Sequence, residues 1–148
     1  MRLVPVDFEV PTGAVSTLFV LEPLGPKHNA ADLAAWTSSI AHIRVTPGFA
    51  GRPWPDRPFS LDENETDLVR HADDFANRTG FAYTVRDPSF GDVIGCVYLY
   101  PPRRSGYDVD VRSWVTAEHA DLDKPLYDFV LGWIAGSWPF TGPDYAER

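Results

Sequence analysis

The sequence predicts a single α/β (α+β) domain over residues 1–148, and three observations lead to this fold class. A chain of 148 residues has the usual size of one domain and is long enough to bury a hydrophobic core. Short strand-like runs alternate with segments whose apolar residues recur every three or four positions, as on one face of a helix. Proline and glycine punctuate these segments instead of forming one linker, so no domain boundary is expected.

The N-terminal third predicts two strands and a helix. Residues 2–10 alternate weakly between apolar and polar side chains, which favours an edge strand inside an extra N-terminal segment, 1–16. Residues 17–24 are rich in β-branched and aromatic side chains and predict a second strand. Asn29 is expected to cap a helix with one buried stripe, formed by Leu33, Trp36, Ile40 and Ile43.

A long loop and a second helix follow. Residues 46–59 contain four prolines and two glycines, which exclude regular structure, yet they also carry three aromatic side chains. Ser60 and Glu63 form a capping box that opens a helix expected to end at Gly80. Its inner face is predicted to consist of Leu61, Leu68, Ala72 and Phe75.

The C-terminal half predicts a hairpin, a third strand and a third helix. Residues 81–87 and 93–100 are strand-like runs joined by turn residues, and 107–115 alternates clearly between two faces. Residues 122–136 have the apolar spacing of a helix, with proline in the first turn. A short last strand is expected after the helix, and residues 142–148 are assigned to a tail.

Composition and charge exclude several classes of function. The formal net charge is −8 and the basic residues are outnumbered and dispersed, so we expect no binding to nucleic acid. The only cysteine, Cys96, cannot form an internal disulfide, and neither it nor the four histidines has the spacing of metal ligands. No signal-peptide pattern and no apolar run of membrane-span length is present. These features predict a cytoplasmic protein without metal or membrane segment.

The order of predicted elements resembles the first two thirds of the GNAT-type N-acetyltransferase family, over residues 17–141. Two segments carry the resemblance: GDVIGCVYLY at 91–100, like the strand before the family's central strand, and VRSWVT at 111–116, like the central strand that leads into a helix. The resemblance implies a GNAT-like mixed, mostly antiparallel twisted sheet flanked by about three helices. It also implies C-terminal truncation, because the sequence ends before the family's last helix and strand pair.

The resemblance also implies acetyl-CoA as the cofactor. In the family, the pantetheine arm lies beside the central strand and the pyrophosphate lies at the following turn and helix N-terminus, where unpaired N–H groups favour an anion. Carried onto this sequence, these places correspond to Trp114, Val115 and Thr116 for the arm, and to Leu122, Asp123 and Lys124 for the pyrophosphate. The turn departs from the family pattern, because residues 117–124 contain three acids and no glycine.

Candidate catalytic residues lie on the two predicted strands of this region. Asp110 is the first candidate for the base that deprotonates the amine, with Asp108 nearby to raise its pKa; alternatively, both acids face solvent or pair with Arg112. Tyr98 is a candidate proton donor to the leaving thiolate, or else a packing residue. The resemblance places acceptor selection near the aromatic loop, which makes His42, Trp54 and Arg57 candidate substrate residues, although such a loop can equally be a lid or an interface.

Three functions follow from these observations. The first is an acyl-CoA-dependent N-acetyltransferase that acts on an amine or small metabolite by direct attack on the thioester. The second is a catalytically inactive GNAT-like binding or regulatory module, which the glycine-free turn and the truncation favour. The third is a protein-interaction domain that uses its aromatic loop. We expect a homodimer in which a second subunit covers the sheet edge that the missing strands leave free.

Overall fold

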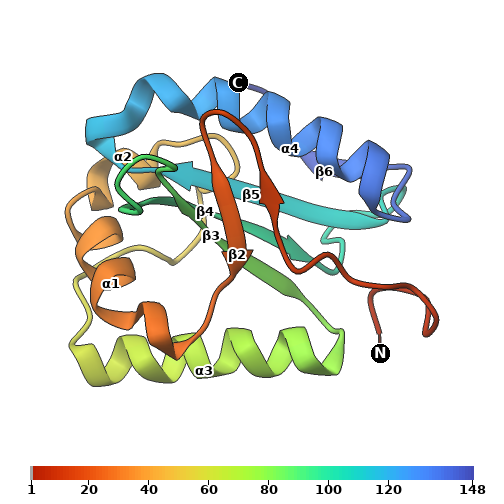
Figure 1. The fold of residues 1–148 in the computed structure, drawn as a ribbon, viewed down its shortest axis with the longest axis horizontal. Helices are drawn as coiled ribbons and strands as arrows, with labels where there is room; N and C mark the ends of the chain where they lie inside the picture. Colours follow the sequence, from red (N-terminus) through yellow and green to blue (C-terminus); the bar gives the residue numbers. More distant parts are fainter. Residues whose placement is uncertain (1) are drawn as a thin grey trace.

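The computed structural model describes residues 2–148 and contains a six-stranded sheet whose strands follow chain order (Figure 1). The strands are β1 (Ala14–Val15), β2 (Val20–Pro23), β3 (Phe81–Arg86), β4 (Val93–Tyr100), β5 (Val109–Val115) and β6 (Pro143–Tyr145). Neighbouring strands from β1 to β5 are antiparallel, whereas β5 and β6 run parallel. The predicted mixed, mostly antiparallel sheet is therefore confirmed.

Helices cover both faces of the sheet. The α-helices are α1 (Asn29–Thr37), α2 (Ile40–Arg44), α3 (Leu61–Asn77) and α4 (Asp123–Ser137); the 3₁₀ helices η1 (Pro26–His28) and η2 (Ala117–Leu122) precede α1 and α4. Helices α1 and α3 lie on one side of the sheet and α4 lies on the other (Figure 1). About three helices were predicted, and the fourth arises because the first predicted helix is divided.

The alternation of β5 determines how the two faces of the sheet are filled. One core cluster joins β5 to α4 and includes Val109, Val111, Val115, Leu126, Val130 and Ile134. The other cluster joins β5 to α1 and α3 and includes Trp114, Trp36 and Leu68. Asp110 and Arg112 share this second face with Trp114, and Asp110 is only 4% exposed. A charged pair is therefore enclosed on the side of α1 and α3.

The prediction of an edge strand at residues 2–10 is wrong, because these residues form no strand. Pro5 interrupts the segment and has no N–H group for a strand ladder. The segment is instead held by Arg78, whose Nη2 donates to the Phe8 carbonyl (2.7 Å) and whose carbonyl accepts from the N–H of Leu3 (2.8 Å). The strand of this region is β1, which pairs with β2.

The first predicted helix is divided into α1 and α2 at Ser38 and Ser39. The Ser38 hydroxyl donates to the Ala35 carbonyl (2.7 Å), and Ser39 has a non-helical backbone at φ −133°. Serine hydroxyls compete with the helical hydrogen-bond ladder in this way. Asn29 is not the predicted cap either, because it is the first residue of α1 and its side chain donates to the Leu61 carbonyl at the start of α3 (2.9 Å).

The second helix and the hairpin agree more closely with the sequence. At the start of α3, Ser60 Oγ accepts from the N–H of Glu63 (3.1 Å) and Glu63 accepts from the N–H of Ser60 (2.9 Å), as the capping box predicts. The helix ends before the predicted Gly80, because Arg78 adopts the left-handed conformation (φ 61°). Strands β3 and β4 form the predicted hairpin. The predicted tail, 142–148, contains β6.

Candidate active site

The edge of β5 that faces β6 is only partly paired. Strand β6 aligns with Val109–Val111, and among residues 2–148 no strand pairs with the rest of this edge, residues 112–115. Two side chains lie there instead: the Tyr145 hydroxyl is hydrogen-bonded to the Ser113 hydroxyl, and Arg148 Nη2 donates to the Ser113 carbonyl (2.7 Å). The Arg148 side chain therefore occupies one free main-chain group of this edge, the Ser113 carbonyl.

Arg148 also connects this edge to the first residue of α4. Its Nε donates to Asp123 Oδ2 at 2.7 Å, and its side chain is only 3% exposed. The second oxygen of Asp123, Oδ1, is buried and accepts no hydrogen bond from any residue that the structure describes. A carboxylate balanced by one arginine thus lies at the N-terminus of α4, where a bound anion would otherwise be favoured.

The side chains assigned to the pantetheine arm lie on different faces of the sheet. Trp114 is fully buried on the side of α1 and α3, and its indole N–H donates to the Tyr98 hydroxyl at 2.9 Å. Val115 packs in the core cluster on the α4 side. Thr116 follows the strand, and its hydroxyl is hydrogen-bonded to Nδ1 of His119 (2.8 Å). The main chain of β5 remains available for a role beside the arm, whereas the Trp114 side chain is enclosed in the core.

The residues assigned to the pyrophosphate lie around the start of α4. Leu122 ends η2 and precedes Asp123, the residue that pairs with Arg148. Lys124 is 65% exposed, and its ammonium group pairs with Asp128 one helical turn later (2.9 Å). Lys124 is therefore held by a surface pair that water screens, and it is able to leave this partner at little cost.

Asp110 is enclosed by arginines. Its carboxylate accepts from Arg52 Nη2 (3.2 and 3.3 Å), and Arg112 Nε lies 3.5 Å from its Oδ2. Asp108 is turned elsewhere, because its carboxylate accepts from the N–H groups of Thr141 (2.8 Å) and Gly142 (3.1 Å) before β6. These contacts favour the alternative in which Asp110 pairs with Arg112 over a role as base.

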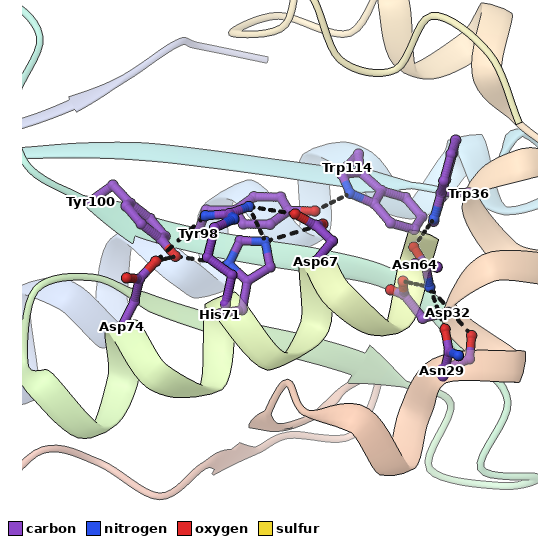
Figure 2. Close-up of polar contacts among 11 residues, drawn as sticks. Asn29, Asp32, Trp36, Asn64, Asp67, His71, Asp74, Tyr98, Tyr100 and Trp114 are labelled. Carbon is purple, nitrogen blue, oxygen red and sulfur yellow. Dashed lines mark hydrogen bonds and ion pairs between the residues drawn. The ribbon is translucent and has the colours of Figure 1, made fainter. Parts of the chain in front are cut away.

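A histidine on α3 is the centre of a hydrogen-bonded chain that the sequence pattern did not indicate (Figure 2). The Tyr100 hydroxyl donates to Asp74 Oδ2 (2.9 Å), so it is free to accept from His71 Nδ1 (2.7 Å). This arrangement places the proton of His71 on Nδ1 and leaves the lone pair on Nε2. Arg70 Nη2 lies 3.3 Å from Nε2, and Asp67 Oδ2 lies 3.6 Å from it. The Nε2 atom of His71 thus points towards the Arg70 guanidinium, with the Asp67 carboxylate beside it.

His71 lines a pocket of about 200 Å³ together with residues from the aromatic loop, α3, β4 and β5. Its lining residues are Trp54, Asp67, Arg70, His71, Tyr98 and Arg112. Two residues predicted from the sequence, Trp54 and Tyr98, therefore lie at one cavity. Tyr98 is 7% exposed, and burial raises the pKa of its hydroxyl well above the ordinary value. Its hydroxyl therefore stays protonated at neutral pH, and the raised pKa makes proton transfer to a thiolate less favourable than from an ordinary tyrosine.

The other two predicted substrate residues do not line this pocket. Arg57 is exposed on the loop and pairs with Glu63 (2.7 Å). His42 lies on α2, where its Nε2 is buried and has no hydrogen-bond partner in the described part of the chain. Their assignment to the acceptor stays a prediction, and the geometry gives Trp54 the stronger claim.

A second polar network joins α1 to α3 (Figure 2). Asn64 donates from Nδ2 to Asp32 Oδ2 (3.1 Å) and to Asn29 Oδ1 (2.8 Å), and its Oδ1 accepts from the indole N–H of Trp36 (3.1 Å). Asp32 is 4% exposed, and burial raises its pKa to about 6. This network fixes the two helices that cover the pocket side of the sheet.

Within residues 2–148, no helix is long and apolar enough to cross a membrane, and no group of three His, Cys, Asp or Glu side chains is arranged to hold a metal ion. The sequence matches no protein-family model, and comparison with curated proteins gives no significant match.

Comparison with solved structures identifies the fold. Ribosomal-protein-S5-alanine acetyltransferase from Vibrio fischeri matches with a TM-score of 0.63 and 13% identity, over 84% of this chain and 67% of that chain. The microcin C7 self-immunity acetyltransferase MccE, in complex with acetyl-CoA and AMP, matches with a TM-score of 0.57 and 12% identity, over 87% and 71%. The Salmonella typhimurium acetyl transferase that modifies the N-terminal serine of ribosomal protein L7/L12 gives 0.57 and 13%, over 84% and 69%. This chain therefore has the GNAT-type acetyltransferase fold.

Proposed function

We propose that this protein is an acyl-CoA-dependent N-acetyltransferase that acts on a small amine. One observation carries the proposal. This chain has the GNAT-type fold, and its strand β6 pairs with only the first three residues of β5, which leaves the edge of residues 112–115 without a strand. This edge is the place where the family resemblance puts the pantetheine arm. The pocket that contains His71 is lined by Arg112 of the same strand, which supports an acceptor site next to the thioester.

The residues beside β5 fit acetyl-CoA if Arg148 moves. The Ser113 carbonyl would accept a hydrogen bond from the pantetheine arm once the guanidinium of Arg148 leaves it. The released guanidinium would then add positive charge close to the N-terminus of α4, where it would attract pyrophosphate together with Lys124. Asp123 opposes this binding by its charge, unless it keeps Arg148 as a partner.

The pocket residues would supply the proton transfers. Acetyl-CoA supplies the acyl thioester. An alkyl ammonium group with a pKa of about 10 must lose a proton before its nitrogen forms the new C–N bond. We assign this proton to Nε2 of His71, whose ring is oriented by Tyr100 and Asp74, once the Arg70 guanidinium moves away from this nitrogen. The Tyr98 hydroxyl would give a proton to sulfur as the C–S bond breaks, and it would regain a proton from the nitrogen, which loses its second proton as the amide forms.

Two measurements test the proposal in order. Calorimetric titration with acetyl-CoA and with coenzyme A shows whether the cofactor binds, and release of free thiol in the presence of a panel of small amines shows whether transfer follows. Micromolar binding and amine-dependent thiol release are expected. Absence of acetyl-CoA binding at millimolar concentration would contradict the proposal.

A catalytically inactive GNAT-like binding module is the second candidate, and the buried Arg148–Asp123 pair favours it. This pair and the glycine-free turn both weigh against pyrophosphate binding. Cofactor binding without thiol release for any amine would support this candidate. The expected homodimer stays a prediction, and light scattering of the purified protein tests it.

A further inference from the structure

The surroundings of Asp110 are positively charged, although the whole chain has a net charge of −8. Arg52, Arg103 and Arg104 line a second pocket of about 260 Å³ together with Asp110 and Asp144. Arg52 pairs with Asp110, and Arg104 pairs with Asp144. Arg112, on the other side of Asp110, adds a further charge, so four arginines surround two carboxylates. This region therefore has an excess of positive charge.

Arg112 is the least satisfied of these arginines. Its side chain is 20% exposed and stacks on the rings of Phe49 (5.4 Å) and Tyr98 (5.1 Å). Its Nε is buried and makes no hydrogen bond to the residues of the described chain, because the Asp110 oxygen at 3.5 Å is too distant or poorly aligned. Burial and the neighbouring charge of Arg52 lower the pKa of Arg112, and Tyr98 and Asp110 offset this effect only in part.

A second donor with the same deficit lines the same pocket. The indole N–H of Trp54 is buried and also lacks an acceptor within residues 2–148. Buried donors are almost always paired, because an unpaired one costs about 1–3 kcal/mol. Both donors belong to residues that line one cavity, and one of them is cationic, so a small movement of these side chains would bring them to an acceptor bound there.

We propose that the pocket lined by Trp54, Tyr98 and Arg112 binds an anionic oxygen group, a carboxylate or a phosphate, of the acceptor amine. The assignment to the acceptor rests on the proposed acetyltransferase function, whereas the anion site itself does not. Arg112 binds the anion by its guanidinium, which forms paired hydrogen bonds with such groups. His71 and Asp67, which line the same pocket, would lie at the amine end of the molecule. The pocket of about 200 Å³ has room for a group of roughly the size of a small amino acid.

The test measures anion binding in the absence of acetyl-CoA, so that it does not depend on catalysis. The indole N–H signal of Trp54 is followed by two-dimensional NMR while the protein is titrated with N-acetylglycine, with its neutral counterpart N-acetylglycinamide, and with inorganic phosphate at constant ionic strength. We expect a saturable shift with N-acetylglycine, with phosphate, or with both, and none with the amide. The response to each anion separates a carboxylate site from a phosphate site.

Variants assign the site to Arg112. Arg112→Met should weaken anion binding about tenfold or more, because it removes a charge-assisted pair. Arg112→Lys keeps the charge without the planar fork and should bind with intermediate affinity, which keeps the test valid where the Met variant folds poorly. Arg2→Met, which removes an exposed arginine outside the pocket, is the control and should bind as the wild type does. Equal binding of the amide, or unchanged anion binding in both Arg112 variants, would overturn the proposal.

Discussion

Asp32 offers a quantitative test of the network between α1 and α3. Its carboxyl group is 4% exposed, and burial raises its pKa to about 6 from the ordinary value of 3.8, although a hydrogen bond from Asn64 partly offsets this effect. Replacement of Asp32 by Asn removes the charge and keeps the shape. The amide oxygen of the variant is able to accept the same hydrogen bond from Asn64, so the network should survive.

The size and sign of the effect follow from the two pKa values. One unit of pKa difference corresponds to about 1.4 kcal/mol, so ionisation of Asp32 costs the folded protein about 3 kcal/mol relative to the unfolded chain. Below pH 3.8 the group is protonated in both states and costs nothing. Between pH 3.8 and 6 the folded state binds more protons than the unfolded state, so stability falls as the pH rises. Above pH 6 the loss is complete.

Asp32→Asn should therefore stabilise the protein at pH 7.5 by about 2 kcal/mol, after a loss of up to about 1 kcal/mol because an acid in the first turn of α1 favours the helix dipole. At pH 4.5 the gain should fall to about 1 kcal/mol or less, because the folded group is protonated there while the unfolded group is still largely ionised. Urea unfolding of both proteins at the two pH values measures the difference. Asp62→Asn, an exposed acid in the first turn of α3, is the control and should not stabilise at either pH. An Asp32→Asn effect that is the same at both pH values would refute the reasoning.

Three further predictions concern the proposed active site. Asp123→Asn should strengthen acetyl-CoA binding about tenfold in calorimetry, because a carboxylate no longer competes with pyrophosphate for Arg148 and the start of α4; weaker binding would contradict this. His71→Gln should lower amine-dependent thiol release about 100-fold or more without changing acetyl-CoA affinity, and unchanged release would remove His71 as the base. Lys124→Glu should alter the free energy of unfolding by less than about 1 kcal/mol and weaken acetyl-CoA binding; equal affinity would place Lys124 outside the site.

Features with a local cause could be predicted from the sequence. The Ser60–Glu63 capping box depends on residues three positions apart, and the structure contains both of its hydrogen bonds. The alternation of β5 is a property of successive residues, and it assigns Val111 and Trp114 to opposite faces. The first helix was predicted as continuous, because the apolar stripe from Leu33 to Ile43 keeps helical spacing across the serines that divide it.

Features that depend on distant partners could not be predicted in the same way. The lone pair of His71 is directed by Tyr100, which lies 29 positions later in the sequence, so spacing along α3 does not reveal it. Arg148 meets Ser113 from 35 positions away. A histidine on the inner face of α3, in line with Leu68 and Phe75, was the one available signal, because such positions are usually apolar.

The two proposed ligands contact different parts of β5, the cofactor its free edge and the acceptor amine the face that α1 and α3 cover, and this separation has a measurable consequence. Ser113 contacts Arg148 beside the proposed cofactor edge, whereas Arg112 lies on the face of β5 that it shares with Trp114, where α1 and α3 cover the sheet. Ser113 and Arg112 are successive residues of β5, so their side chains point to opposite faces of the sheet. Arg148, which contacts Ser113, is therefore able to move without disturbing Arg112. Asp123→Asn should therefore change acetyl-CoA affinity and leave anion binding unaltered, and Arg112→Met should do the reverse. A change in both affinities by either variant would mean that β5 does not divide the site into donor and acceptor halves.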